Sequence, residues 1–155
     1  MIWDVILGST EEKLLVIWEK DNWDSITVKA YIDHILQSVV LSFFQQQRTQ
    51  SVFFMDDNAP AHNAKVIKEW KVNHSIQTLD WPSSFSDLNL IENIWSILKN
   101  WLQAREPRPQ RIDEIKQAVM EEWNAITVEE IQKCVDSMPK QIQAVISNDG
   151  GHTCW

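Results

Sequence analysis

Two carboxylates in this chain stand where they could bind metal ions. Asp57 follows the apolar segment Val52 to Met55, and Glu92 lies in a largely apolar stretch that begins at Leu88. An isolated charge beside buried apolar groups is unfavourable unless a partner or a metal compensates it. Hard divalent cations such as Mg²⁺ prefer carboxylate oxygens as ligands. Asp57 and Glu92 are therefore candidate ligands of a divalent metal site.

The strands that must position these carboxylates follow from short apolar runs. Ile2 to Leu7 and Leu14 to Trp18 predict an antiparallel pair, and further strands are predicted at Val52 to Met55 and Ile76 to Trp81. The segment Val52 to Met55 is apolar on both sides of the pleat, which predicts a strand buried on both faces. Asp57 would then stand at a strand end, where open α/β sheets place their ligands.

Apolar residues at helical spacing predict the remaining elements, and the last strand precedes a helix that carries Glu92. The predicted helices are Val28 to Phe44 with Thr27 as its cap, Pro60 to Trp70, Asp87 to Gln103, Arg111 to Asn124 and Val128 to Ile146. Glu92 sits beside the apolar stripe of its helix, so we expect it to reach toward a neighbouring strand end. The pattern predicts one α/β domain over residues 1–155, with the sheet part at about 1–104 and C-terminal helices at about 110–147.

Three sequence blocks carry a family resemblance. Asp57 begins Asp-Asn-x-Pro-x-His, Trp81-Pro82-Ser83 follows, and Glu92 lies in Asp-Leu-Asn-x-Ile-Glu-Asn-x-Trp. In this order the blocks resemble the second and third catalytic blocks of the mariner-like (Tc-type) DNA transposases. The 34 residues between Asp57 and Glu92 match the spacing in that family's Asp-Asp-Glu triad. The tail from Ser137 to Thr153 resembles the family's C-terminus, so the likeness runs from about Met1 to Trp155.

The resemblance implies a ribonuclease H-like fold, which is a mixed sheet flanked by helices, with a helical C-terminal part. In that fold a central first strand carries the first catalytic aspartate, and the chain begins after it, as it does after the family's DNA-recognising helix-turn-helix. We expect the strands at Ile2 to Leu7 and Val52 to Met55 to lose a shared partner. The two edges would pair directly, accept a strand from another chain, or leave the isolated chain unstable.

The family's reaction is Mg²⁺-dependent DNA cleavage and strand transfer at a two-ion site. The resemblance makes Asp57 the second and Glu92 the third catalytic and metal-binding residue. Because the first has no counterpart, we expect a remnant of a transposase catalytic domain that is inactive alone. One alternative is a non-catalytic protein-interaction module derived from a transposase. Another is a different ribonuclease H-like nuclease, which would need a further acidic residue in the pocket.

Two other acidic residues interrupt or end the predicted strands. Asp4 is a candidate substitute for the missing aspartate, although its strand would place the carboxylate in a different position, and a buried charge there would be destabilising. Asp56 stands where the family commonly has glutamine. Because strand side chains alternate, Asp56 should point away from Asp57 and should not be a ligand.

Four polar residues in the same blocks are candidate supports of the site. Asn58 could orient a metal ligand or flanking DNA, although turn chemistry also explains an asparagine there. His62 could approach a phosphate, but a surface or capping role is the simpler interpretation. Asn89 and Asn93 flank Glu92 and could hold it through hydrogen bonds. A cap or turn role remains open for the two carboxylates as well.

The charge composition limits which binding partners the chain could have. The chain has 14 Lys and Arg against 22 Asp and Glu, and the resulting net charge of -8 opposes tight binding to a phosphate backbone. Lysines such as Lys65, Lys68 and Lys71 could touch phosphates, but scattered lysines usually form a solvated face. DNA at transposon ends is the partner that the family implies, bound weakly or not at all by this chain alone, and a second copy or a full-length transposase is a further candidate.

Targeting signals and membrane spans are not evident in the sequence. No apolar run approaches the roughly 18 residues of a membrane span, and nothing at the start resembles a signal peptide. We expect no membrane partner and an intracellular location, which the family places in the nucleus.

Overall fold

The computed structural model describes residues 2–7, 12–18, 23, 25–46, 52–56, 59, 62–79 and 88–151. These residues belong to two compact units, one within residues 1–18 and 86–155 and the other within residues 19–85. The single domain expected from the sequence stays a prediction.

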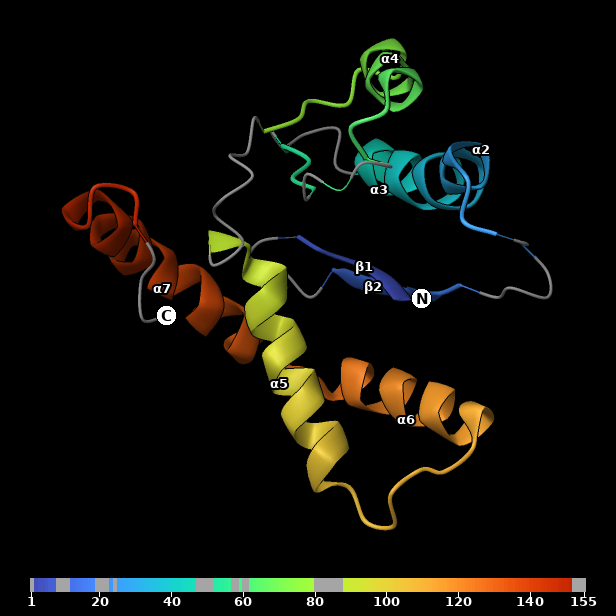
Figure 1. The fold of residues 1–155 in the computed structure, drawn as a ribbon, viewed down its shortest axis with the longest axis vertical. Helices are drawn as coiled ribbons and strands as arrows, with labels where there is room; N and C mark the ends of the chain where they lie inside the picture. The colour runs from blue at the N-terminus through green and yellow to red at the C-terminus, as the bar shows by residue number, and fades with distance from the viewer. Residues whose placement is uncertain are drawn as a thin grey trace. The chain divides into compact units, whose positions relative to one another are not determined.

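The first unit contains an antiparallel hairpin, drawn in blue in Figure 1. β1 (Ile2–Ile6) pairs with β2 (Lys13–Ile17), and the amide of Leu7 donates to the carbonyl of Glu12 at 2.9 Å. The predicted antiparallel pair is confirmed. Within the described ranges β1 has a strand partner on this one edge only.

Three helices complete the first unit: α5 (Leu90–Ala104), α6 (Ile112–Ala125) and α7 (Val128–Ser147). α5 packs against both α6 and α7, and α6 also contacts β2 (Figure 1). The apolar stripes of the helices meet in one core, onto which the hairpin packs through Ile2, Ile6 and Leu15. The buried members of this core are Ile94, Leu98, Val119, Trp123, Ile126, Ile131 and Cys134. Helical periodicity predicted all three helices because each buries one face.

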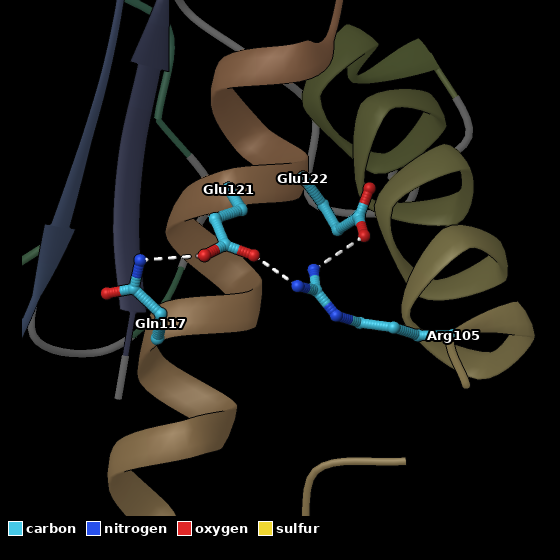
Figure 2. Close-up of polar contacts among 4 residues, drawn as sticks. All are labelled: Arg105, Gln117, Glu121 and Glu122. Atoms are coloured by element: carbon cyan, nitrogen blue, oxygen red, sulfur yellow. Dashed lines mark hydrogen bonds and ion pairs between the residues drawn. The ribbon is translucent and has the colours of Figure 1, made fainter. Parts of the chain in front are cut away.

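Arg105, which follows α5, joins that helix to α6 through a fork of ion pairs (Figure 2). Its Nη1 donates to Oε1 of Glu122 at 2.9 Å, and its Nη2 donates to Oε2 of Glu121. Oε1 of Glu121 also accepts from Nε2 of Gln117 at 2.8 Å. The hydrogen bonds from Gln117 and Arg105 lower the pKa of Glu121 because they stabilise its ionised form. The fork therefore ties the end of α5 to the surface of α6.

The second unit contains one continuous helical stretch made of α2 (Val28–Tyr31), the π-helical segment η1 (Ile32–Val40) and α3 (Leu41–Gln46). The hydroxyl of Thr27 accepts from the amide of Ala30 at 3.1 Å, which confirms the predicted cap. The periodicity of the sequence gave no sign of the π-helical winding.

The helix predicted from Pro60 begins later than expected. α4 runs over Lys65–Asn73, and the amide of His62 donates to the carbonyl of Ala59 at 2.9 Å. Pro60 lies outside the described residues, but residues 62–64 were predicted to be helical and are not, so the helix begins later than predicted.

The two strands predicted in the second unit are reduced, in the part of the chain that the structure describes, to a parallel bridge between Phe54 and Thr78. The amide of Phe54 donates to the carbonyl of Gln77 at 2.7 Å, and the amide of Leu79 donates to the carbonyl of Phe54 at 2.9 Å. Phe53 is 56% exposed, so the prediction of burial on both faces is wrong.

The described residues are α/β, but more helical than predicted. None of their helices is both long and apolar enough to cross a membrane.

Candidate functional site

Glu92 lies in the first turn of α5, with its side chain exposed. The helix starts there because Oδ1 of Asn89 accepts from the amide of Ile91 at 3.2 Å, and the carbonyl of Asn89 accepts from the amide of Glu92 at 3.0 Å. An acidic side chain in a first turn is favoured by the helix dipole. Asn89 thus supports Glu92 by fixing the start of the helix that carries it. Asn93 is half-buried on the same helix, and its supporting role stays a prediction.

Asp4 is a second carboxylate of the first unit that interacts with Glu92. It lies between Ile2 and Ile6 on β1, and these two neighbours pack against the core. Because alternate residues of a strand share a face, the Asp4 side chain faces the same way. Its Oδ2 is fully buried and accepts no hydrogen bond from the described residues. Burial, and next the negative charge of Glu92, raise the pKa of Asp4 from 3.8 to about 7.

The pair formed by Asp4 and Glu92 offers two carboxylates of different character. Burial and the nearby charge of Glu92 disfavour the ionised form of Asp4, whereas the side chain of Glu92 is exposed. A two-ion centre usually needs three acidic residues. No group of three or more His, Cys, Asp or Glu side chains suited to a metal occurs among the residues that the structure describes. The pair by itself therefore supplies at most two of the three acidic residues that such a centre needs.

Asp57 and Asn58 lie outside the described residues, so the expected convergence of Asp57 with Glu92 stays a prediction. The residue before them is described. Asp56 forms an ion pair with Lys71 of α4, with Oδ2 and Nζ 2.5 Å apart. Lys71 is 6% exposed, so its expected place on a solvated face is wrong. Sequence reasoning missed this pair because the two residues are 15 positions apart and Lys71 stands among exposed lysines.

His62 is half-buried in the turn before α4. Its ring stacks on that of Tyr31, with ring centroids 4.7 Å apart and an angle of 27° between the ring planes. Tyr31 is only 1% exposed. The structure therefore gives His62 a packing contact that the interpretation as a surface or capping residue did not include.

A hollow of about 410 Å³ lies where α6 ends and α7 begins, lined by Lys13, Ile131 and residues 124–129. Nζ of Lys13 donates to the carbonyl of Asn124 at 3.3 Å and to that of Ile126. The side chain thus satisfies carbonyls at the end of α6 and ties β2 to that helix. None of the residues predicted from the sequence to form the site lines this hollow.

Comparison with known proteins shows the family of the chain and its similarity to transposases. Residues 3–116 match the family described as DDE superfamily endonuclease. The Tcb2 transposase of a transposable element from Caenorhabditis briggsae is 30% identical over 150 residues, which are 97% of this chain and 52% of that protein. The Tc1 transposase from Caenorhabditis elegans is 31% identical over 126 residues, 81% of this chain and 45% of that protein. The chain spans about half the length of these curated relatives.

Solved structures show the same relationship at the level of the fold. The structure of the Mos1 transposase catalytic domain and Raltegravir with Mn has a TM-score of 0.72 and 18% sequence identity, and the match covers 92% of this chain and 70% of that one. The Mos1 mariner paired end complex with Mn has a TM-score of 0.71 and 17% identity over 91% of this chain and 40% of that one. The likeness shows the ribonuclease H-like fold of these catalytic domains, and the predicted resemblance is confirmed.

Proposed function

The chain belongs to the DDE superfamily endonuclease family, with Tc1/mariner transposases as its relatives, and from this membership we propose that it derives from a catalytic domain that cuts and joins transposon DNA. One observation carries the proposal: the family match over residues 3–116 includes both Asp57 and Glu92. The relatives are about twice as long as this chain.

We assign Asp57 and Glu92 as metal ligands and catalytic residues, and Mg²⁺ or Mn²⁺ as the metal. The chemistry of the donor set fits, because both are carboxylates and that of Glu92 is exposed at a helix start fixed by Asn89. A bound metal would activate a water or a 3′-hydroxyl and stabilise the leaving oxygen. Asn58 and Asn93 are proposed as supports of these ligands.

The 155-residue chain alone should have little or no activity. The family's triad has three carboxylates, and Asp57 and Glu92 account for two of them. A first strand carrying the third would pair beside β1 in the proposed ribonuclease H-like arrangement. Asp4 replaces it poorly, because its carboxylate resists ionisation at neutral pH. Two carboxylates hold Mg²⁺ weakly, so metal binding is a better test than DNA cleavage.

Titration with Mn²⁺ and Mg²⁺ by calorimetry tests this assignment. We expect weak binding by the unaltered chain and its loss in Asp57→Asn and in Glu92→Gln. Glu129→Gln is the matched control for Glu92, because Glu129 is an exposed acid in the first turn of α7. Binding that is equal in all the variants, or absent from the unaltered chain, would refute the metal site.

A second function, that of a protein-interaction module, is favoured by the edge of β1. Leu7 and Glu12 form a hydrogen-bonded pair, so by alternation the backbone groups of Ile2, Asp4 and Ile6 point away from β2. Within the described ranges no other strand pairs with them. Such an edge can accept a strand of another chain.

Sedimentation of the purified chain tests the second function. A concentration-dependent dimer that Ile2→Pro abolishes would support it, because proline removes an amide from this edge. A monomer at every concentration would count against self-association through the edge.

The expected nuclear location also stays a proposal, and imaging of a fluorescently tagged chain would test it.

A further inference from the structure

Lys71 is the buried cation of the second unit as far as the structure describes it. The residue is 6% exposed, although it lies in the last turn of α4. Burying an ammonium group is costly unless a counter-charge and hydrogen bonds compensate it. Its surroundings should therefore explain why the chain places a lysine there.

Three contacts surround Lys71. Its Nζ pairs with Oδ2 of Asp56 at 2.5 Å and lies 5.1 Å from the centroid of the Phe54 ring. Its backbone carbonyl accepts from the amide of Ile76 at 2.9 Å. Phe54 and the segment after Ile76 are also joined to each other through the parallel bridge to Thr78. Lys71 thus connects α4 to both segments of this bridge.

The ion pair differs from its neighbour on the same helix. Lys65 and Glu69 of α4 are 3.6 Å apart, and their side chains are 89% and 59% exposed. The side chains of Lys71 and Asp56 are 7% and 20% exposed. Exposed pairs contribute little, whereas removal of one partner from a buried pair leaves an uncompensated charge. The Lys71 pair therefore constrains the chain in a way that the Lys65 pair does not.

The residue that this pair holds immediately precedes Asp57. We propose that Lys71 and Asp56 are positioning residues, which anchor the end of the Val52 to Asp56 segment on α4 and thereby fix the backbone that leads into the candidate metal ligand. This inference rests on the proposed function for its metal-binding consequence. Its structural part, an anchored backbone before Asp57, stands independently of any metal.

Four variants separate positioning from mere stabilisation. Lys71→Met and Asp56→Asn each remove one charge, Lys71→Arg keeps the cation, and Lys65→Met is the exposed control on the same helix. We expect Lys71→Met and Asp56→Asn to weaken Mn²⁺ binding about tenfold at temperatures where each variant is folded. Lys71→Arg should restore most of the affinity, and Lys65→Met should leave it unchanged.

Amide hydrogen exchange without metal gives a second reading. The exchange of residues 55–58 should become faster in Lys71→Met and Asp56→Asn than in Lys65→Met. If neither exchange nor Mn²⁺ affinity differs from the Lys65→Met control, the positioning role is overturned, even where the melting temperature falls. If exchange responds as expected but the unaltered chain binds no Mn²⁺, the metal proposal fails and the positioning pair remains.

Discussion

Asp4 on β1 and Glu92 on α5 are electrostatically coupled, although 87 residues separate them in the sequence. Asp4 has a buried oxygen that receives no hydrogen bond from the described residues, while Glu92 is exposed. The negative charge of Glu92 adds to the effect of burial and disfavours ionisation of Asp4. The pair therefore lowers the stability of the folded chain when both carboxylates are charged.

The coupling predicts a pH dependence of stability with a definite sign. The pKa of Asp4 rises from 3.8 to about 7 on folding, so the folded state binds more protons between these pH values. This contribution to stability is fully present below about pH 4 and is lost as the pH rises through about 7. The loss is on the order of 4 kcal/mol at most, since each pH unit corresponds to about 1.4 kcal/mol.

Urea unfolding of the unaltered chain and of Asp4→Asn, at about pH 4.5 and about pH 8, isolates this contribution. Asparagine keeps the shape and removes the charge, so Asp4→Asn should gain stability relative to the unaltered chain at the higher pH. The exposed Asp33→Asn is the control and should show no such change. A difference between Asp4→Asn and the unaltered chain that stays constant with pH would contradict the coupling.

The hydrogen bonds of Lys13 at the end of α6 predict a large loss of stability when this one side chain is replaced. Lys13→Met removes a charged donor from the carbonyls of Asn124 and Ile126 and keeps an apolar stem of similar length. Loss of hydrogen bonds to a charged group should lower the free energy of unfolding by about 2 kcal/mol. The exposed Lys133→Met on α7 should be nearly neutral. Chemical denaturation of the unaltered chain and the two variants measures both changes in the free energy of unfolding. Equal changes in the two variants would show that the Lys13 hydrogen bonds contribute nothing.

The Arg105 fork predicts a small effect that depends on salt. Its ion pairs lie at the surface, with Arg105 32% and Glu121 45% exposed, so Arg105→Gln should lower the melting temperature by roughly 1–3 °C at low salt. At about 1 M salt the difference should shrink, because the screening length falls to about 3 Å. Thermal melts at both salt concentrations decide this, and Lys140→Gln is the exposed control. A loss that persists undiminished at high salt would indicate packing instead of charge.

Elements with a strong local signal could be predicted from the sequence. The hairpin and α5 follow from apolar periodicity, and the start of α5 depends on the cap at Asn89, which is a local interaction. The π-helical segment η1 could not be predicted, because its apolar spacing also fits an α-helix. The exposure of Phe53 depends on which segments pack around it, and the sequence pattern holds no such information.

For the candidate site, too, local features could be predicted from the sequence and long-range contacts could not. A motif located Glu92, and the structure places it in the first turn of α5, which begins at Leu90, three residues later than the predicted helix. The coupling between Asp4 and Glu92, and the pair formed by Asp56 and Lys71, join residues that are distant in the sequence. Such contacts are set by tertiary packing, so periodicity and motif spacing could not reveal them.

The cap at Asn89 predicts a local loosening of the helix start that carries Glu92. Asn89→Ala removes the acceptor of the Ile91 amide and should lower the free energy of unfolding by about 1 kcal/mol. Asn89→Asp should restore most of this, because aspartate caps helices as well as asparagine does. Thr127→Ala removes the equivalent cap of α7, whose hydroxyl accepts from the amide of Glu130 at 3.3 Å. Both alanine variants should lose similar stability, but hydrogen exchange at Ile91 and Glu92 should become faster in Asn89→Ala alone. Faster exchange there in Thr127→Ala too would mean that the start of α5 is held by the packed core and not by its cap.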